Sequence, residues 1–297
     1  MSMQTRPRGL RRLCRLLGYS PQAYYQYQRI SFKRRLGEDL LVNQVLAHRR
    51  LQPRLGGRKL HEMLLFFMED HDLYMGRDQL FDLLRENNLL VKKRRRSQPR
   101  TTDSKHWLKR YPDLTTKVKL NRADQLWVSD ITYIRLTGKR FAYLSLVTDA
   151  YSRKIVGFHI SDSLLTEGPV AALQMALGNR SGDGPLIHHS DRGTQYCADE
   201  YISLLKANGI SISMTQSGDP RDNAIAERVN GILKQELLLE AYPNIKRAHQ
   251  SLVAAVDIYN RIRPHSSLDM MTPEKAHNRT GAIRRRWKSW LDRQQAV

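Results

Sequence analysis

The sequence predicts an α/β protein in which a basic, all-helical segment precedes a mixed five-stranded sheet flanked by helices. Apolar residues recur at helical spacing as far as about residue 91, and they alternate at strand spacing from residue 126. The two spacings then follow one another to about residue 240. A chain of 297 residues is long enough for two or three domains with at least one sizeable core.

The charge of the chain changes at the same place. Residues 1–125 carry 28 Lys and Arg against 12 Asp and Glu, a net +16, whereas residues 126–297 carry 22 against 17, a net +5. A basic half joined to a nearly balanced half indicates a nucleic-acid-binding arm attached to a domain with another task. A membrane surface is the alternative, but the sequence has neither an apolar run of 18 residues nor a signal-peptide core. We therefore expect a soluble, intracellular protein.

The basic arm begins with residues 9–29, which predict two short helices around a turn. Gly18 ends the first helix, Ser20 caps the second and Pro21 opens it. This is the pattern of a helix-turn-helix, and a small helical hairpin without a role in DNA binding is the alternative.

A second helical unit is predicted over residues 38–92, with an apolar stripe that runs from Leu60 to Met68 at helical spacing. Five consecutive cations then open a stretch without an apolar period. Because like charges repel unless something anionic accepts them, a phosphate-contacting linker is favoured over a solvated one. The predicted contacts in this linker are Lys92, Lys93, Arg94, Arg95 and Arg96.

From residue 126 the pattern predicts three strands joined by hairpins, followed by helices that alternate with two more strands. The predicted strands are 127–134, 141–148, 154–160, 186–189 and 210–214, and the helices between them are 167–177 and 199–208. Such an order gives a mixed sheet with helices on its faces. This order resembles that of ribonuclease H-like folds, and the resemblance implies that the strand of Asp130 lies beside the strand that ends near Asp191.

Three acids occupy positions that a folded core rarely gives to acids. Asp130 shares a strand face with apolar residues, Asp191 follows a short apolar run at a Gly turn, and Glu227 lies on a helix that follows a Gly- and Pro-rich loop. Such carboxylates would repel one another and resist burial unless a cation joined them. Oxygen ligands select Mg²⁺ or Mn²⁺, and two such ions about 3.5 to 4 Å apart promote in-line phosphodiester displacement. We predict that Asp130, Asp191 and Glu227 are both catalytic and metal-ligating.

Helical spacing places Glu227, Asn230 and Lys234 on one face of that helix. An ordinary solvated face is one interpretation. However, Glu227 and Lys234 are separated by two turns, roughly 10 Å, which is too far for a good ion pair. We predict that Glu227 binds metal while Lys234, Asn230 and Arg221 contact DNA.

Asp149, His188 and His189 also lie near the acids in sequence. We interpret Asp149 as a structural residue that closes a turn at a strand end, helped by an ion pair with Arg153. The two histidines are interpreted as core residues with satisfied hydrogen bonds.

Together these motifs resemble the DDE transposases of bacterial insertion sequences, which share the retroviral-integrase catalytic core. The resemblance rests on residues 127–133, 189–196 and 222–227, on the 35 residues between Asp191 and Glu227, on Lys234, and on residues 259–268. It covers roughly residues 10–280. It implies metal-dependent cleavage at the ends of a mobile element and attack of the 3′-OH on target DNA, with two Mg²⁺ or Mn²⁺ ions per site. The alternatives are a ribonuclease H-like nuclease or resolvase that cuts without joining, and a catalytically inactive DNA-binding relative.

The same resemblance implies partners and a division into domains. The partners are double-stranded DNA, as element ends and as target, further copies of the chain on that DNA, and an upstream-frame protein of the same element. The location implied is the nucleoid in a bacterial cytoplasm. The expected parts are a helix-turn-helix-like segment (1–36), a winged-helix-like DNA-binding domain (37–91), a basic linker (92–124), a catalytic core (125–240) and a C-terminal helical extension with a basic tail (241–297).

Overall fold

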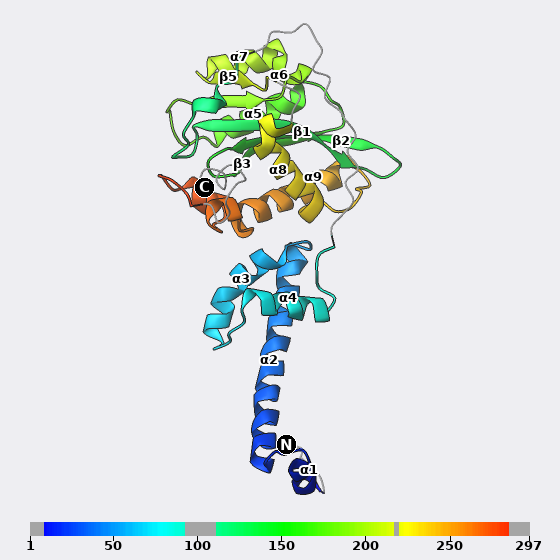
Figure 1. The fold of residues 1–297 in the computed structure, drawn as a ribbon. Helices are drawn as coiled ribbons and strands as arrows, with labels where there is room; N and C mark the ends of the chain where they lie inside the picture. The colour runs from blue at the N-terminus through cyan, green and yellow to red at the C-terminus, as the bar shows by residue number, and fades with distance from the viewer. Residues whose placement is uncertain (1–8, 93–110, 217–219, 285–297) are drawn as a thin grey trace. The chain divides into compact units, whose positions relative to one another are not determined.

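The computed structural model describes residues 9–92, 111–216 and 220–284, which fall into two compact units (Figure 1). The first unit comprises the chain up to residue 50 together with residues 56–90, and the second comprises residues 51–55 and the chain from residue 91 onward. The cationic residues Lys93 to Arg96 lie outside the described residues.

The first unit is helical throughout its described part. Its helices are α1 (Leu10–Leu16), α2 (Pro21–Leu51), α3 (Gly57–Asp70) and α4 (Arg77–Glu86). As predicted, Ser20 caps α2, because its Oγ accepts the Ala23 amide at 3.0 Å. Leu41 and Val45 are buried on α2, as are Leu60, Leu64, Leu80 and Leu84 on α3 and α4.

Two expectations for this unit need correction. The second predicted helix is not short, because α2 continues for 31 residues, so the expected boundary after residue 36 lies inside one helix. Burial of Leu41 and Val45 favours the continued helix, and Gly37 packs closely against Leu73 instead of ending it. Within residues 9–92 the structure contains no strand, so the described part of the winged-helix-like domain has no wing.

The second unit is built on the predicted mixed five-stranded sheet. Its strands are β1 (Leu126–Arg135), β2 (Phe141–Asp149), β3 (Ile155–Ser161), β4 (Ile187–Ser190) and β5 (Ser211–Met214), in the order β3-β2-β1-β4-β5. The first three strands pair antiparallel, whereas β4 runs parallel to β1 and to β5. This order confirms the ribonuclease H-like arrangement predicted from the sequence.

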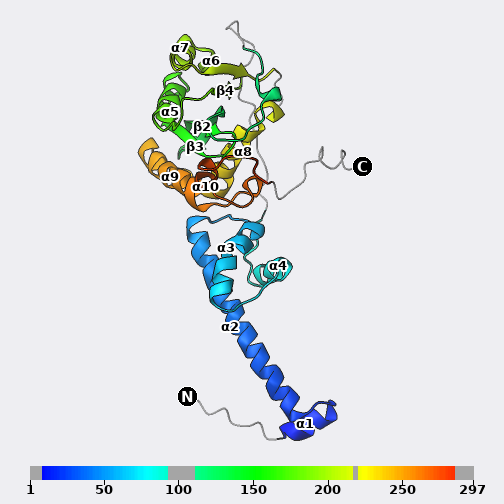
Figure 2. The same cartoon turned by 90° about the vertical axis from the view of Figure 1, so that its left-hand side faces the viewer.

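Helices cover both faces of this sheet (Figure 2). One core contains Trp127 and Val147 from the sheet and packs against α5 (Glu167–Gly178), α6 (Thr194–Cys197) and α7 (Asp199–Ala207). The other contains Ile134 and Leu144 and packs against α8 (Ala224–Ile232) and α9 (Ile245–Asp257). Each of these two helices continues as one π-helical stretch, η3 (Leu233–Leu237) and η4 (Ile258–Ile262) respectively. Shorter elements are the 3₁₀ turns η1 (Thr115–Lys117), η2 (Pro220–Asn223) and η5 (Ser266–Leu268), and the helix α10 (Pro273–His277).

The motif at residues 259–268 fastens the C-terminal helices to the sheet. The Ile155 amide donates to Asn260 Oδ1 and the Asn260 side-chain amide donates to the Ile155 carbonyl, both at 3.0 Å. Asn260 thus acts like a neighbouring strand where the β2–β3 register shifts. Arg263, only 1% exposed, donates through Nε and Nη2 to both carboxylate oxygens of Glu236 at 2.8–2.9 Å. The contacts of Asn260 and Arg263 thus give this motif a structural role.

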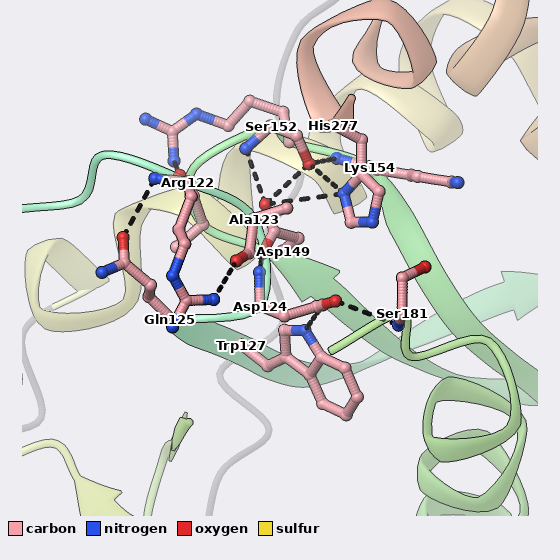
Figure 3. A network of polar contacts seen from close by, with 12 residues as sticks. Arg122, Ala123, Asp124, Gln125, Trp127, Asp149, Ser152, Lys154, Ser181 and His277 are labelled. Atoms are coloured by element: carbon pink, nitrogen blue, oxygen red, sulfur yellow. Dashed lines mark hydrogen bonds and ion pairs between the residues drawn. The ribbon is translucent and has the colours of Figure 1, made fainter. Parts of the chain in front are cut away.

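Asp149 is the centre of a buried polar network at the end of β2 (Figure 3). It accepts hydrogen bonds from the Ser152 amide and hydroxyl and from the Asp124 amide, and His277 of α10 lies 3.9 Å away. Burial raises the pKa of Asp149, and the hydrogen bonds from Ser152 oppose that rise. These contacts fit the turn interpretation, and the Arg153 guanidinium donates to the Ala150 carbonyl. The ion pair between Asp149 and Arg153 stays a prediction.

Candidate active site

The sheet brings the first two predicted acids together. In the parallel β1–β4 pair, Val128 is the partner of His189. Two residues further along each chain lie Asp130 and Asp191, so the register carries both acids to the same level of the sheet. Asp191 follows β4 in a tight turn, since its Oδ1 accepts the Gly193 amide at 3.0 Å. Neighbouring strand ends are a usual place for a site in an α/β sheet.

Glu227 is brought toward these acids by the way α8 begins. The Asn223 side-chain amide donates to the Ser129 carbonyl at 2.8 Å, and His189 Nε2 lies 3.2 Å from the Asp222 carbonyl. These contacts tie the start of α8 to β1 and β4. Glu227 is exposed in the first turn of the helix, where the helix dipole favours a negative charge.

The three carboxylates share one electrostatic environment. Burial raises the pKa of Asp130 to about 7, and the Asp191 carboxylate is the next largest cause of that rise. The Glu227 carboxylate raises it further, whereas a hydrogen bond from the Asn230 amide, 2.6 Å from Asp130 Oδ2, lowers it. The charges of Asp191 and Glu227 therefore both act on Asp130, while the shared metal site of the three acids stays a prediction.

The predicted DNA-contacting residues have different surroundings. Lys234 is exposed as a residue, but its ammonium lies in a partly buried position, where it donates to Thr132 Oγ1 at 3.0 Å, on the same strand as Asp130. This partial burial of the ammonium lowers the pKa of Lys234, whereas the Asp130 carboxylate acts to raise it. Asn230 is buried and faces Asp130, while Arg221 lies in the turn η2 and Lys92 is exposed. The DNA contacts of all four residues stay predictions.

Carboxylate oxygens are suitable ligands for Mg²⁺ or Mn²⁺. Among the residues that the structure describes, no group of three His, Cys, Asp or Glu side chains is arranged closely enough to hold a metal ion. Two observations nevertheless fit a hydrated cation beside Asp130. Negative charge is crowded there, and Asn223 Oδ1 and Asn230 Oδ1 are buried without a hydrogen-bond partner in the described structure. Ligation would have to draw the three carboxylates closer together.

Sequence reasoning did not identify the residues that support the site. Asn223 is not among the residues predicted for the site, yet its side-chain amide fastens α8 to β1. His188 Nε2 contacts Ser129 Oγ at 2.7 Å and the Tyr201 hydroxyl at 2.9 Å, and burial lowers its pKa to about 3. His188 is therefore a core residue as predicted, but its hydrogen bonds are not all satisfied, because its buried Nδ1 has no partner among the described residues. The signal for Asn223 was its position directly before the helix of Glu227.

The raised pKa of Asp130 predicts a pH-dependent gain of stability in the metal-free Asp130→Asn variant. Because the folded-state pKa lies above the unfolded one, the acid is protonated in both states well below the unfolded pKa and costs little near pH 4. Between the unfolded pKa and the folded pKa of about 7, the unfolded chain ionises while the folded state keeps its proton, so wild-type stability falls across this range and levels off above pH 7. The variant is expected to be more stable than wild type at pH 8 but not at pH 4, in urea unfolding with a chelator. The exposed Asp183→Asn control should show no such gain, and an equal gain at both pH values would contradict the prediction.

Comparisons with known proteins match the part of the chain that carries these residues. A family model described as an integrase core domain matches residues 121–220, and a second with the same description matches residues 208–273. An uncharacterized 31 kDa protein of insertion element IS600 from Shigella sonnei is 33% identical over 89% of this chain and 98% of its own length. The transposase for insertion sequence element IS629 from the same organism is 36% identical, and the match covers 52% of each chain.

Among solved structures, the catalytic core domain of HTLV-2 integrase in complex with magnesium is 20% identical with a TM-score of 0.43, and the match covers 53% of this chain and 98% of that one. No helix within the described ranges is long and apolar enough to cross a membrane. The match to the IS600 protein over nearly its whole length and the integrase core models over residues 121–273 show the family. The chain belongs to the insertion-sequence transposases that carry an integrase core domain.

Proposed function

We propose that this transposase cleaves the DNA ends of its mobile element in a metal-dependent step and transfers the resulting 3′-OH to target DNA. The observation that supports the proposal best is the placement of Asp130 on β1 and of Asp191 directly after the neighbouring parallel strand β4, within the electrostatic reach of Glu227. A shared cluster of acids on an integrase core is suited to a polynucleotidyl transfer.

The three acids would hold the cations, Asp130 and Asp191 for one ion and Glu227 for a second. Bound Mg²⁺ or Mn²⁺ ions would supply activation of a water or hydroxyl and stabilisation of the leaving oxygen. The protein's own groups orient this set. Asn230 fixes one oxygen of Asp130 through its amide, and Asn223 holds the helix of Glu227 against β1.

Lys234 supplies positive charge next to the acids. Its ammonium donates a hydrogen bond to Thr132 Oγ1, and the nearby Asp130 carboxylate acts to raise its pKa. A phosphate that approached Asp130 could replace the neutral hydroxyl acceptor of this ammonium with a charged oxygen, which makes a stronger hydrogen bond. We therefore propose that Lys234 holds a phosphate next to the reacting bond.

The proposed substrates are double-stranded element ends and target DNA, and the proposed assembly on them contains further copies of the chain. An upstream-frame protein remains a prediction from the sequence alone. Lys92 and the cations that follow it in the sequence would contact phosphates of the same DNA.

A strand-transfer assay tests the function. The full chain is incubated with a labelled duplex that carries the element's end, with Mg²⁺ and a supercoiled target plasmid. Cleavage at the 3′ end followed by covalent joining of the label to the plasmid is expected. Cleavage without joining would favour the nuclease or resolvase alternative, and binding without cleavage would favour an inactive relative.

A further inference from the structure

A basic surface lies at the C-terminal end of β1. It combines the hairpin between β1 and β2 with the first turn of α9, and we call it the hairpin surface. Its five cations are all exposed. They are Arg135, Lys139, Arg140, Lys246 and Arg247.

Backbone contacts hold the two segments of the hairpin surface together. The Thr137 amide donates to the Tyr242 carbonyl at 2.9 Å, and the Tyr242 amide donates to the Arg135 carbonyl at 3.0 Å. The Arg140 guanidinium reaches the Pro243 carbonyl at 3.4 Å, directly before α9. Tyr242 itself is buried. The hairpin and the start of α9 therefore present their charges as one rigid surface.

The positive charge of this surface is not neutralised inside the protein. In the part of the chain that the structure describes, no ion pair is found for any of the five cations. Glu240 is the exposed acid in the same stretch of chain. Lys246 and Arg247 occupy the first turn of α9, which contains no acid, although the helix dipole disfavours cations there.

The turn of the hairpin also contains a residue in an unfavourable backbone conformation. Lys139 has φ +60°, a left-handed conformation that costs a residue other than glycine roughly 1 kcal/mol. The unfavourable conformation concerns Lys139 and the unfavourable dipole concerns Lys246 and Arg247, which are separate members of the hairpin surface. An anionic ligand would compensate the repulsion and the dipole at once.

The hairpin surface is connected to the active site through β1. Arg135 ends that strand five residues after Asp130, which is about 17 Å along a strand. Thr132 lies between them on the strand, and its hydroxyl accepts a hydrogen bond from the Lys234 ammonium. The positive charge of Arg135 lowers the pKa of Lys234, after the larger effect of burial. Since each nucleotide of duplex DNA advances about 3.4 Å, the same length corresponds to roughly five nucleotides.

We infer that the hairpin surface binds the phosphate backbone of the element-end duplex about five nucleotides from the reacting phosphate. The inference rests on the proposed function for the identity of the reacting phosphate. It adds a second group of contacts that would fix the direction in which the duplex leaves the carboxylates. An acidic protein segment is the competing ligand for such a surface.

The test uses two charge-removal variants of the full chain, Arg135→Gln/Lys139→Gln/Arg140→Gln and Lys246→Gln/Arg247→Gln. Each is expected to bind the element-end duplex about tenfold or more weakly at physiological salt, and to lower the salt slope by about 0.9 for each phosphate that the protein no longer neutralises. Glu240→Lys should bind more tightly with a steeper slope. The double variant Lys206→Gln/Lys275→Gln removes exposed cations from α7 and α10 and should have little effect.

A methylphosphonate scan of the same duplex locates the contact. Removing the charge of a phosphate about five nucleotides from the reacting one should weaken wild-type binding but not further weaken the hairpin variants. Wild-type affinity and slope in both hairpin variants, or decreases equal to those of the control, would overturn the inference. That result would leave the proposed function intact if Asp191→Asn still abolishes cleavage. Weaker binding to an acidic protein with unchanged DNA affinity would likewise overturn the inference.

Discussion

Asp191→Asn is expected to lower the rate of DNA cleavage by about a thousandfold or more, while the protein still folds and binds duplex DNA. Asp191 directly follows the strand next to that of Asp130, and the neutral amide would remove one ligand charge from the site. Loss of several kcal/mol of metal-assisted transition-state stabilisation corresponds to such a factor. The measurement is single-turnover cleavage of the element end with Mg²⁺. Asp130→Asn and Glu227→Gln should behave alike.

The control for this result separates chemistry from folding. Asp183→Asn removes an exposed acid on the same unit and should cleave at the wild-type rate. The three active-site variants should melt at or above the wild-type temperature without metal, because each removes repulsion. A near-wild-type rate in any one of them would show that the residue is not a metal ligand.

Arg263→Ala is expected to destabilise the second unit by about 3–5 kcal/mol, because it leaves the Glu236 carboxylate without its bidentate partner in a mostly buried position. All four tryptophans of the chain lie outside the first unit, so tryptophan fluorescence in a urea titration follows the second unit alone. Arg261→Ala is the matched control from the same turn. Its exposed ion pair with Asp257 should contribute at most about 0.5 kcal/mol.

A companion variant tests whether the charge pair itself matters. Arg263→Met/Glu236→Leu removes both charges and should recover much of the stability that Arg263→Ala removes, because the main penalty is the unpaired buried charge. If Arg263→Ala unfolds at the same urea concentration as wild type, the ion pair between Arg263 and Glu236 does not hold the end of η4 against η3.

The sheet and its acids could be predicted because their signals are local. Alternation of apolar residues defines β1, β2 and β3 to within one or two residues, and the acids interrupt apolar runs where no acid is needed for packing. The direction of Asn230 could not be predicted in this way. Helical spacing places it beside Glu227, but only the packing of α8 on β1 turns its amide toward Asp130.

The parts that escaped prediction depend on distant partners. The exposed stretch of α2 lacks an apolar period and so predicts a short helix, yet Leu41 and Val45 are buried within the first unit and extend it. The stretches η3 and η4 have no sequence signature of their own, and they occur where Glu236 and Arg263 meet. Tertiary contacts decided each of these features.

The strand order also governs when the active site can form during folding. The β1–β2–β3 meander closes through short hairpins, whereas the parallel β1–β4 pair requires the chain between Arg135 and Ile187 to be looped back first. Because closing a longer loop costs more entropy, the meander is expected to form early and the β1–β4 pair late. An early folding intermediate would then carry Asp130 without Asp191 or Glu227 beside it. On the proposed function, DNA cleavage would require the complete sheet, so that a nascent or partly folded chain would leave DNA uncut.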